Sequence, residues 1–365
     1  MRACVISAIL VSMAGAQKAP PPSFDDLARR ANTAREHDRL DEAVTLYQRA
    51  LKLKPSWAEG WWSLGTILYD SDRHPECAAA FSRFVALKPE VGPGHAFLGL
   101  CEFGRSSYDP ALRSLFRAQD LGFAGDQQLR QVAIYHTALA LILKRNFEKA
   151  IEQLAIVVTI SAAPAAARTA AGLAVLRMPV LPDHVPPGDK PLVDRVGDAM
   201  LASLERRADE AAQLFDRLLA DYPKTPELHY AYGSILLSSD PARGVALLKQ
   251  ELAISPDHVP ALASLAYEYL KENDSSQALS YAQKATILAP ADFAARTALG
   301  RALLEQGRLA DSIRELETAV KLAPDSPQAR FALANAYTKA GRPEDADRER
   351  KEFNRLRKLL DSGRK

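Results

Sequence analysis

Several protein classes are excluded by what this chain of 365 residues lacks. Its three cysteines are too few for a disulfide framework and do not have the spacing of a zinc site. Its 47 basic and 45 acidic residues nearly balance, so the composition gives no sign of the basic face expected for nucleic-acid binding. Hydrophobic residues make up 47% and aromatic residues only 7%, which fits an ordered, alanine-rich helical protein. Beyond the N-terminus, no apolar run is long enough to span a bilayer.

Catalytic motifs are also missing. The seven histidines are scattered and form no His-Glu-x-x-His zinc motif. There is no Cys-x-x-Cys-His haem site, glycine-rich phosphate loop or Gly-x-Ser-x-Gly nucleophile elbow. We therefore expect neither an enzyme nor a bound cofactor or metal. An alternative is an enzyme with a site around Asp183, His184 and Asp189, although one histidine on a proline-rich loop is more often exposed and inert.

The N-terminus has the pattern of a secretory signal. Arg2 is followed by an apolar run from Ala3 to Met13 and then by Ala14-Gly15-Ala16, the small-x-small pattern that signal peptidase requires. We expect residues 1–16 to be removed, residues 17–23 to form an unstructured proline-rich start, and the protein to be periplasmic or secreted. The alternative is a plain hydrophobic N-terminal helix.

The rest of the chain repeats with a period of 34 residues. Prolines mark this interval at Pro256, Pro290 and Pro324, and again at Pro55 and Pro89. A fixed period of this length indicates a stack of similar helical units. Counting back from the prolines gives nine unit starts, which are Phe24, Ala58, Gly92, Gln131, Leu192, Pro226, Val259, Phe293 and Pro327.

Two positions of each unit are small throughout. Position 8 is Ala31, Gly65, Gly99, Ala138, Ala199, Gly233, Ala266, Gly300 and Ala334. Position 20 is Ala43, Cys77, Ala111, Ala150, Ala211, Gly244, Ala278, Ser312 and Ala346, provided that one residue is missing from the turn of the Pro226 unit. Two antiparallel helices approach closely only where side chains are small, so these positions predict the crossing point of a helical hairpin.

These residues resemble the tetratricopeptide repeat, whose pattern has an aromatic at position 4, Leu-Gly at 7 and 8, Ala at 20, an aromatic at 24 and Pro at 32. The Ala58 unit matches at Trp61, Leu64-Gly65, Cys77, Phe81 and Pro89. The resemblance implies an all-α fold, a right-handed α-solenoid of antiparallel helix pairs. It also implies a scaffold that binds proteins or peptides on its concave surface.

We expect four units over residues 24–164, an interruption over 165–191, five units over 192–360 and a short tail at 361–365. Within the interruption, Ala165 to Arg177 suits one helix, whereas the five prolines from Met178 to Pro191 exclude a regular helix. The interruption is interpreted as an insertion on one edge of the array, or as a hinge or an ordered loop that reaches into the groove. The charged last helix, Arg342 to Leu360, is expected to be a solvated cap rather than a membrane or nucleic-acid contact.

If the first helix of each unit lines the concave surface, positions 2, 5, 9, 12 and 13 form its ligand-facing stripe. Alternatively, these side chains pack against neighbouring first helices. The known carboxylate clamp of chaperone-binding relatives is not supported, since position 5 is Ala28 or Phe331 where position 9 is asparagine. The main ligand site is expected in the aromatic-rich units from Ala58 to Leu143. The candidate groove residues are Trp62, Tyr69, Phe103, Tyr135, Tyr230, Tyr267, Arg301, Phe331 and Asn335.

Two further alternatives concern the cysteines and assembly. Cys77 and Cys101 are expected on adjacent helices of neighbouring units, where they either form a disulfide in an oxidising compartment or remain as buried thiols. Besides a partner-binding scaffold and an enzyme, the repeats suit a self-assembling array whose end units dock head to tail. The sequence does not identify the partner or the oligomeric state.

Overall fold

The fold is all-α. The computed structural model describes residues 22–160 and 165–362, and within these ranges it contains nineteen α-helices, one short 3-10 helix and no strand. The predicted signal peptide at residues 1–16 lies outside the described residues, as does the end of the tail. The N-terminal helices are α1 (Phe24–Glu36), α2 (Leu40–Leu53), α3 (Ala58–Asp70), α4 (His74–Leu87), α5 (Gly92–Gly104), α6 (Tyr108–Leu121), α7 (Gln127–Leu143) and α8 (Phe147–Ile160).

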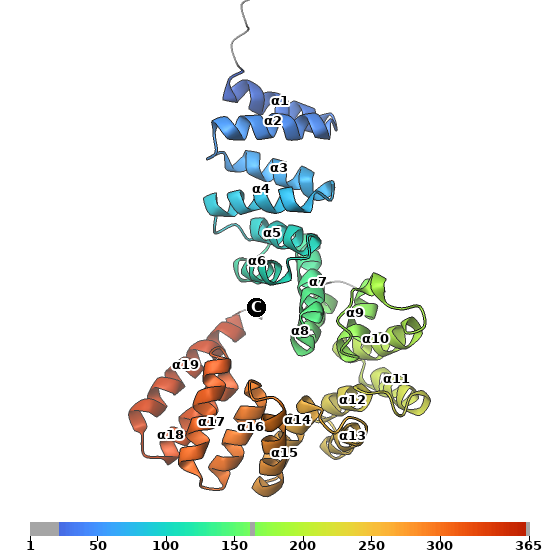
Figure 1. Cartoon of the computed structure of the whole chain (residues 1–365), viewed down its shortest axis with the longest axis vertical. Coiled ribbons are helices and arrows are strands. Elements are labelled where there is room, and N and C mark those ends of the chain that lie inside the picture. The colour runs from blue at the N-terminus through green and yellow to red at the C-terminus, as the bar shows by residue number, and fades with distance from the viewer. Residues whose placement is uncertain (1–21, 161–164, 363–365) are drawn as a thin grey trace, which may run out of the picture.

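The second half continues the same alternation of helices and short turns. Figure 1 shows the pairs stacked side by side, with a bend after α8 that turns the second half away from the direction of the first. Its helices are α9 (Ala165–Val175), α10 (Lys190–Leu204), α11 (Ala208–Asp221), α12 (Leu228–Leu236), α13 (Pro241–Ile254), α14 (Val259–Lys271), α15 (Ser275–Leu288), α16 (Phe293–Glu305), α17 (Leu309–Leu322), α18 (Pro327–Lys339) and α19 (Pro343–Ser362).

The predicted crossing point is confirmed. A Cβ atom at Gly300 would lie 2.5 Å from Leu316 Cγ of the partner helix, and one at Gly65 would lie 2.7 Å from the Phe81 ring. Real Cβ atoms do not approach so closely, so only a residue without a side chain fits there. Ser312 at position 20 also donates a hydrogen bond of 2.6 Å to the Gly300 carbonyl. The small residues therefore set the distance between the two helices of a hairpin.

A second repeated contact joins one hairpin to the next. In the units that begin at Ala58, Phe293 and Pro327, the side chain at position 4 donates a hydrogen bond to the carbonyl of the proline that closes the preceding unit. Trp61 Nε1 donates to Pro55 O at 2.8 Å, and Arg296 Nε donates to Pro290 O at 2.6 Å. Arg330 donates to Pro324 O in the same way. A carbonyl after the end of a helix is thus satisfied, which fixes the angle at which the next hairpin leaves.

The turn inside each hairpin has a residue in the left-handed conformation at position 15. Examples are Asp72 (φ 54°), Ser106 (φ 61°) and Arg206 (φ 61°), whereas Gly307 and Gly341 supply a glycine at the same place. The next residue's N–H closes the helix end, as in Ser107 N–H to Glu102 O at 2.8 Å. The Pro226 unit lacks this residue, because the deletion predicted there removes it from the turn.

The first helices lie on the inner side of the curved stack. Successive first helices contact one another. The contacting pairs are α3 with α5, α5 with α7, α14 with α16, and α16 with α18. Successive second helices have almost no such contacts in the described part of the chain. Because the helices closest together lie inside the curve, the expectation that the first helices line the concave surface is supported. These contacts are largely missing between α10, α12 and α14.

The interruption is not an insertion on the edge, as one interpretation of the sequence proposed. Helix α9 is a full antiparallel partner of α10, and the two touch where a Cβ at Gly172 would lie 1.9 Å from Val193 O. Their alanine-rich faces are buried in a core that runs from α7 to α13. Helix α10 also begins at Lys190, earlier than expected, since Pro191 falls in its first turn, where proline is tolerated. The array thus continues through the interruption.

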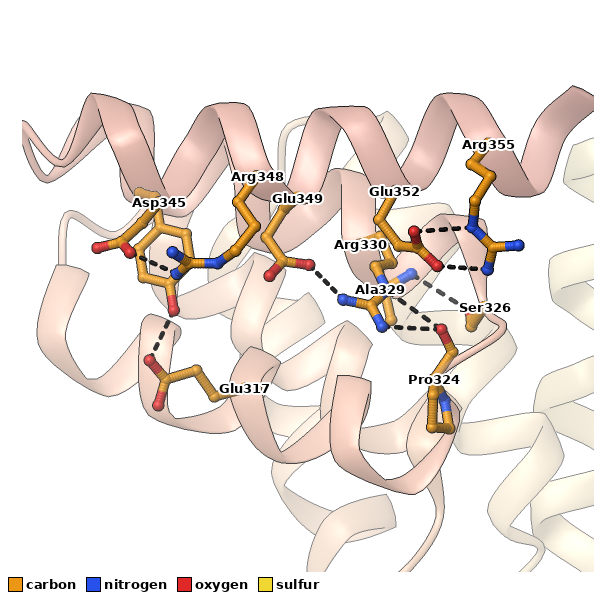
Figure 2. Close-up of polar contacts among 11 residues, drawn as sticks. Glu317, Pro324, Ser326, Ala329, Arg330, Asp345, Arg348, Glu349, Glu352 and Arg355 are labelled. Carbon is orange, nitrogen blue, oxygen red and sulfur yellow. Dashed lines mark hydrogen bonds and ion pairs between the residues drawn. The ribbon is translucent and has the colours of Figure 1, made fainter.

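The last helix has the polar face expected of a cap. Figure 2 shows Arg330 of α18 bound to Glu349 of α19 and to the Pro324 carbonyl, with the Glu352–Arg355 pair beside it. The charged side chains of α19 are largely paired with one another along the exposed surface. Because exposed pairs of this kind are screened by water, they contribute mainly solubility.

We predict that Ser106→Gly raises the free energy of unfolding by about 0.5–1 kcal/mol, because glycine adopts positive φ without steric cost. Ser106 is exposed, so no packing is lost. The measurement is the shift of the urea midpoint followed by circular dichroism. The matched reverse change, Gly307→Ser, places a side chain in open space and should destabilise by a similar amount. Equal midpoints for all three proteins would contradict the role assigned to this turn.

Candidate functional site

The N-terminal candidates form an aromatic cluster on the inner side of the stack. The Trp62 ring lies edge-on to Phe81, Phe84 and Phe97, with centroid distances of 5.1–5.6 Å. Tyr69 packs on Phe97 in the same manner. These contacts are typical of packed aromatic pairs, so Trp62 holds neighbouring units together. Tyr69 also borders a cavity of about 210 Å³ between α3, α5 and α7, which is the part of this cluster open to a ligand.

Phe103 and Tyr135 lie further along the same surface, where α7 meets α9. Phe103 packs edge-on against the His136 ring, at 5.0 Å between centroids. Tyr135 donates a hydrogen bond of 3.2 Å to the Ala166 carbonyl. Burial raises the pKa of Tyr135 to about 12, and the Asp183 carboxylate acts in the same direction. The phenol is therefore a neutral tether between α7 and α9, and both residues serve packing more than ligand contact.

The C-terminal candidates are more varied. Tyr267 donates to the Ala294 carbonyl at 3.2 Å, and burial raises its pKa to about 12. The Arg301 guanidinium lies 5.4 Å from the centre of the Tyr267 ring and has no carboxylate partner among the described residues. Phe331 is 51% exposed, with one edge against Phe353 of α19. Asn335, one unit beyond Arg301, is half-buried. Phe331 is thus the most exposed of these candidates, whereas Arg301 is half-buried.

A cavity of about 240 Å³ lies where the two halves of the array meet, and we call it the joint cavity. Helices α8, α9, α10 and α12 contribute its lining, and the predicted groove residue Tyr230 forms part of its wall. Phe147, Ile151 and Met200 are among its apolar lining residues, while Ser203 and Ser234 add hydroxyl groups. The cavity exists because α10 and α12 do not pack on one another as other first helices do.

A charged network closes one side of the joint cavity. The Arg177 guanidinium is bound by Glu148 and by Glu227, the latter at 3.0 Å. His258 accepts the Ala261 N–H on Nδ1, so its Nε2 carries the proton and donates to Glu227 at 2.8 Å. His258 and Glu227 are largely buried, whereas Glu148 is 51% exposed, so water screens the outer part of the network.

Glu251 of α13 joins the network through the backbone of Glu227. Its side chain is fully buried and accepts the backbone N–H groups of Glu227 and Tyr230, at 3.0 and 3.2 Å. A carboxylate at the start of α12 satisfies N–H groups that the helix cannot, and it faces the positive end of the helix dipole. Burial raises the pKa of the neighbouring Tyr230 to about 12, with Glu148 adding to the effect. Its phenol stays neutral up to about pH 12 in the folded chain. The stability that burial of the neutral form gives is present in full below about pH 10 and is lost as the pH rises from about 10 to about 12, because the unfolded tyrosine ionises first.

The network was missed in the sequence, although one signal pointed to it. Glu251 falls at position 27, which is apolar in the other eight units. Arg177 gave no signal, because it lies in the interruption and its partners come from α8 and the start of α12. Only the fold brings these residues together.

The repeat architecture now has independent support. The family profile described as "Tetratricopeptide repeat" matches residues 29–91, 202–259, 264–316 and 297–347, more than half of the chain. The chain belongs to the tetratricopeptide repeat family. This confirms the resemblance drawn from the small positions and the closing prolines. Proteins of this scaffold typically bind other proteins.

Solved structures with similarity to this tetratricopeptide repeat protein include several of MamA. "MamA AMB-1" is 25% identical over 44% of this chain and 96% of that one, with a TM-score of 0.38. "MamA 41-end from Desulfovibrio magneticus RS-1" is 23% identical over 46% of this chain and 98% of that one, with a TM-score of 0.39. No curated protein matches the chain.

The alternative enzyme site finds no support in the geometry. His184 and Asp183 are exposed on the 3-10 turn Pro182–His184, and Asp189 is exposed beyond it. Within residues 22–160 and 165–362, no hydrogen bond or ion pair joins the three, and no group of His, Cys, Asp and Glu side chains is arranged to hold a metal. Nor does any helix in this part of the chain have the length and apolar character needed to cross a membrane.

Cys77 and Cys101 form a disulfide in the structure. They lie on α4 and α5, with Cα atoms 5.8 Å apart, a separation usual for bonded cysteines. Both residues are fully buried, and Cys77 also occupies the small position 20 of its unit. The disulfide joins the second helix of one unit to the first helix of the next.

We predict that the native protein, purified without reductant, contains no thiol at Cys77 or Cys101 that reacts with iodoacetamide under denaturing conditions. After reduction both should be alkylated, and peptide mass spectrometry distinguishes them from Cys4. The double change Cys77→Ala and Cys101→Ala should destabilise by about 3 kcal/mol, since the bond closes a loop of moderate length. Full alkylation without prior reduction would show that the two thiols are free.

Proposed function

We propose that this protein is a non-enzymatic scaffold of the cell envelope that holds an extended peptide or a partner protein in its concave groove. The observation that carries the proposal is two cavities that first helices help to line, one of about 240 Å³ among α8, α9, α10 and α12 and one of about 210 Å³ between α3, α5 and α7. Concave apolar sites with a few polar groups are where proteins bind ligands. The family's usual role in binding proteins supports this proposal.

The C-terminal part of the groove offers the more accessible surface. In the units from Ala58 to Leu143, where we expected the main site, most aromatic rings pack against one another. From the joint cavity onward, the groove carries Tyr267, the Arg301 cation and the exposed ring of Phe331. Arginine and aromatic residues are enriched among the residues that contribute most to binding. We therefore assign the partner surface to the first helices from α10 to α18.

The double variant Phe331→Glu and Arg301→Ala should weaken partner binding by roughly tenfold or more, because it replaces an exposed aromatic and a cation in the groove. The measurement is affinity capture from the native extract, quantified by mass spectrometry. The matched control is Ile287→Glu with Lys321→Ala, which changes exposed residues of the second helices α15 and α17. Capture that the groove variant leaves undiminished, with circular dichroism unchanged, would argue against the groove.

We also propose export, which rests on the signal-like residues 1–16 and agrees with a disulfide between Cys77 and Cys101, since such bonds persist in oxidising compartments. In its native host the mature protein should begin at Gln17 and appear in the periplasmic or secreted fraction. N-terminal sequencing of the purified protein measures this. A chain that retains Met1 or Arg2 in the cytosolic fraction would contradict export.

A further inference from the structure

We propose that the joint cavity is an anchor pocket for one aromatic side chain of a peptide, and that it favours a basic residue next to that side chain. The inference rests on the proposed peptide-binding function and adds the kind of residue that is recognised. It also gives the interruption of the array a role, since α8 and α9 supply walls that an uninterrupted groove would not have.

The size of the joint cavity suits one large side chain. An apolar cavity of about 150 Å³ in a protein accepts a benzene molecule. The joint cavity measures about 240 Å³, so a benzyl, phenol or indole group fits with room for the atoms that connect it to a backbone. Two of the four walls come from groove positions of α10 and α12, which places the pocket along the path of a peptide in the groove. A peptide ligand therefore reaches it without any change in the helices.

The chemistry of the walls favours an aromatic over an aliphatic occupant. Arg177 lies 5.3 Å from the ring centre of Phe147 and 6.0 Å from that of Tyr230, so its guanidinium already makes cation–π contacts with two aromatic residues of the wall. Its guanidinium is held in place by two carboxylates, so its planar face is oriented before a ligand arrives. Met200 adds a thioether, which makes favourable contacts with ring edges. Cation–π and sulfur–aromatic contacts are absent for a leucine side chain.

The negative charge beside the joint cavity favours a basic residue next to the aromatic residue of the peptide. One guanidinium, Arg177, faces two carboxylates, Glu148 and Glu227, while His258 is uncharged when its Nδ1 accepts the Ala261 N–H. The group therefore carries a net negative charge. Glu148 is 51% exposed, so its second oxygen is open to a ligand. A lysine or arginine next to the aromatic residue meets this charge favourably, whereas an acidic residue meets it with repulsion.

The test uses the full chain labelled with methyl-¹³C methionine and observed by NMR. Met200 lines the joint cavity and Met178 lies outside it, so their methyl signals serve as reporter and internal reference. The Met200 signal is assigned with Met200→Leu. The probes are three capped tetrapeptides, acetyl-Ala-Phe-Lys-Ala-amide, acetyl-Ala-Leu-Lys-Ala-amide and acetyl-Ala-Phe-Glu-Ala-amide. The first should shift the Met200 signal by its ring current and saturate at a concentration about fivefold lower than either of the others, the difference expected for one cation–π or charge contact.

Two variants separate pocket binding from other effects. Ser203→Phe places a ring from α10 into the joint cavity and should abolish the Met200 shift, and Ile235→Trp should do so from α12 if the first variant unfolds. Ser238→Phe is the control, since Ser238 is exposed just beyond α12 and outside the cavity. No Met200 shift with any peptide, or equal saturation by the leucine peptide, overturns the proposal. Partner capture that is lost in the groove variant but kept in Ser203→Phe would leave the scaffold function intact and reject only the pocket.

Discussion

The structure depends on one repeated close contact, the crossing of two antiparallel helices at small residues. A side chain at Gly300 or Gly65 would overlap the partner helix, and the other crossing positions carry only alanine, glycine, serine or cysteine, so the hairpins close only at small residues. With that distance fixed, the larger residues around the crossing interlock into a core, and the next hairpin is aligned through side-chain bonds to the closing proline. Stability in such an array accumulates from each unit and its neighbours.

The functional features arise where this regularity fails. The Pro226 unit lacks the turn residue that ends other first helices, and its first helix α12 is short, running from Leu228 to Leu236. Helix α12 also packs little on α10. Helix α9 is inserted in the stack, and its end brings Arg177 beside Glu227. The resulting space is partly filled by charged groups that satisfy one another and partly left as the joint cavity. The irregular junction of the repeat therefore holds both the charged network and the cavity.

The groove residues named from the sequence lie on first helices, and their role in ligand contact stays a prediction. Trp62, Tyr135 and Tyr230 do lie on first helices, but each ring is engaged by a neighbouring helix or carbonyl. Positions 2, 5, 9, 12 and 13 indicate the direction in which a side chain points from its own helix. It does not say how far away the next helix is, and that distance decides whether a ring packs or stays free. Phe331 is exposed because only α19 follows it.

The sequence by itself determined the family, the helix order and the crossing points, because these depend on contacts within one unit and on a period that nine copies repeat. Tertiary structure alone decided the partnership of α9 with α10, the network around Glu227 and the joint cavity. These involve residues such as Arg177 and Glu251 from non-equivalent units, each present once. A repeat alignment shows only what the units share. It therefore cannot predict contacts that occur at a single junction.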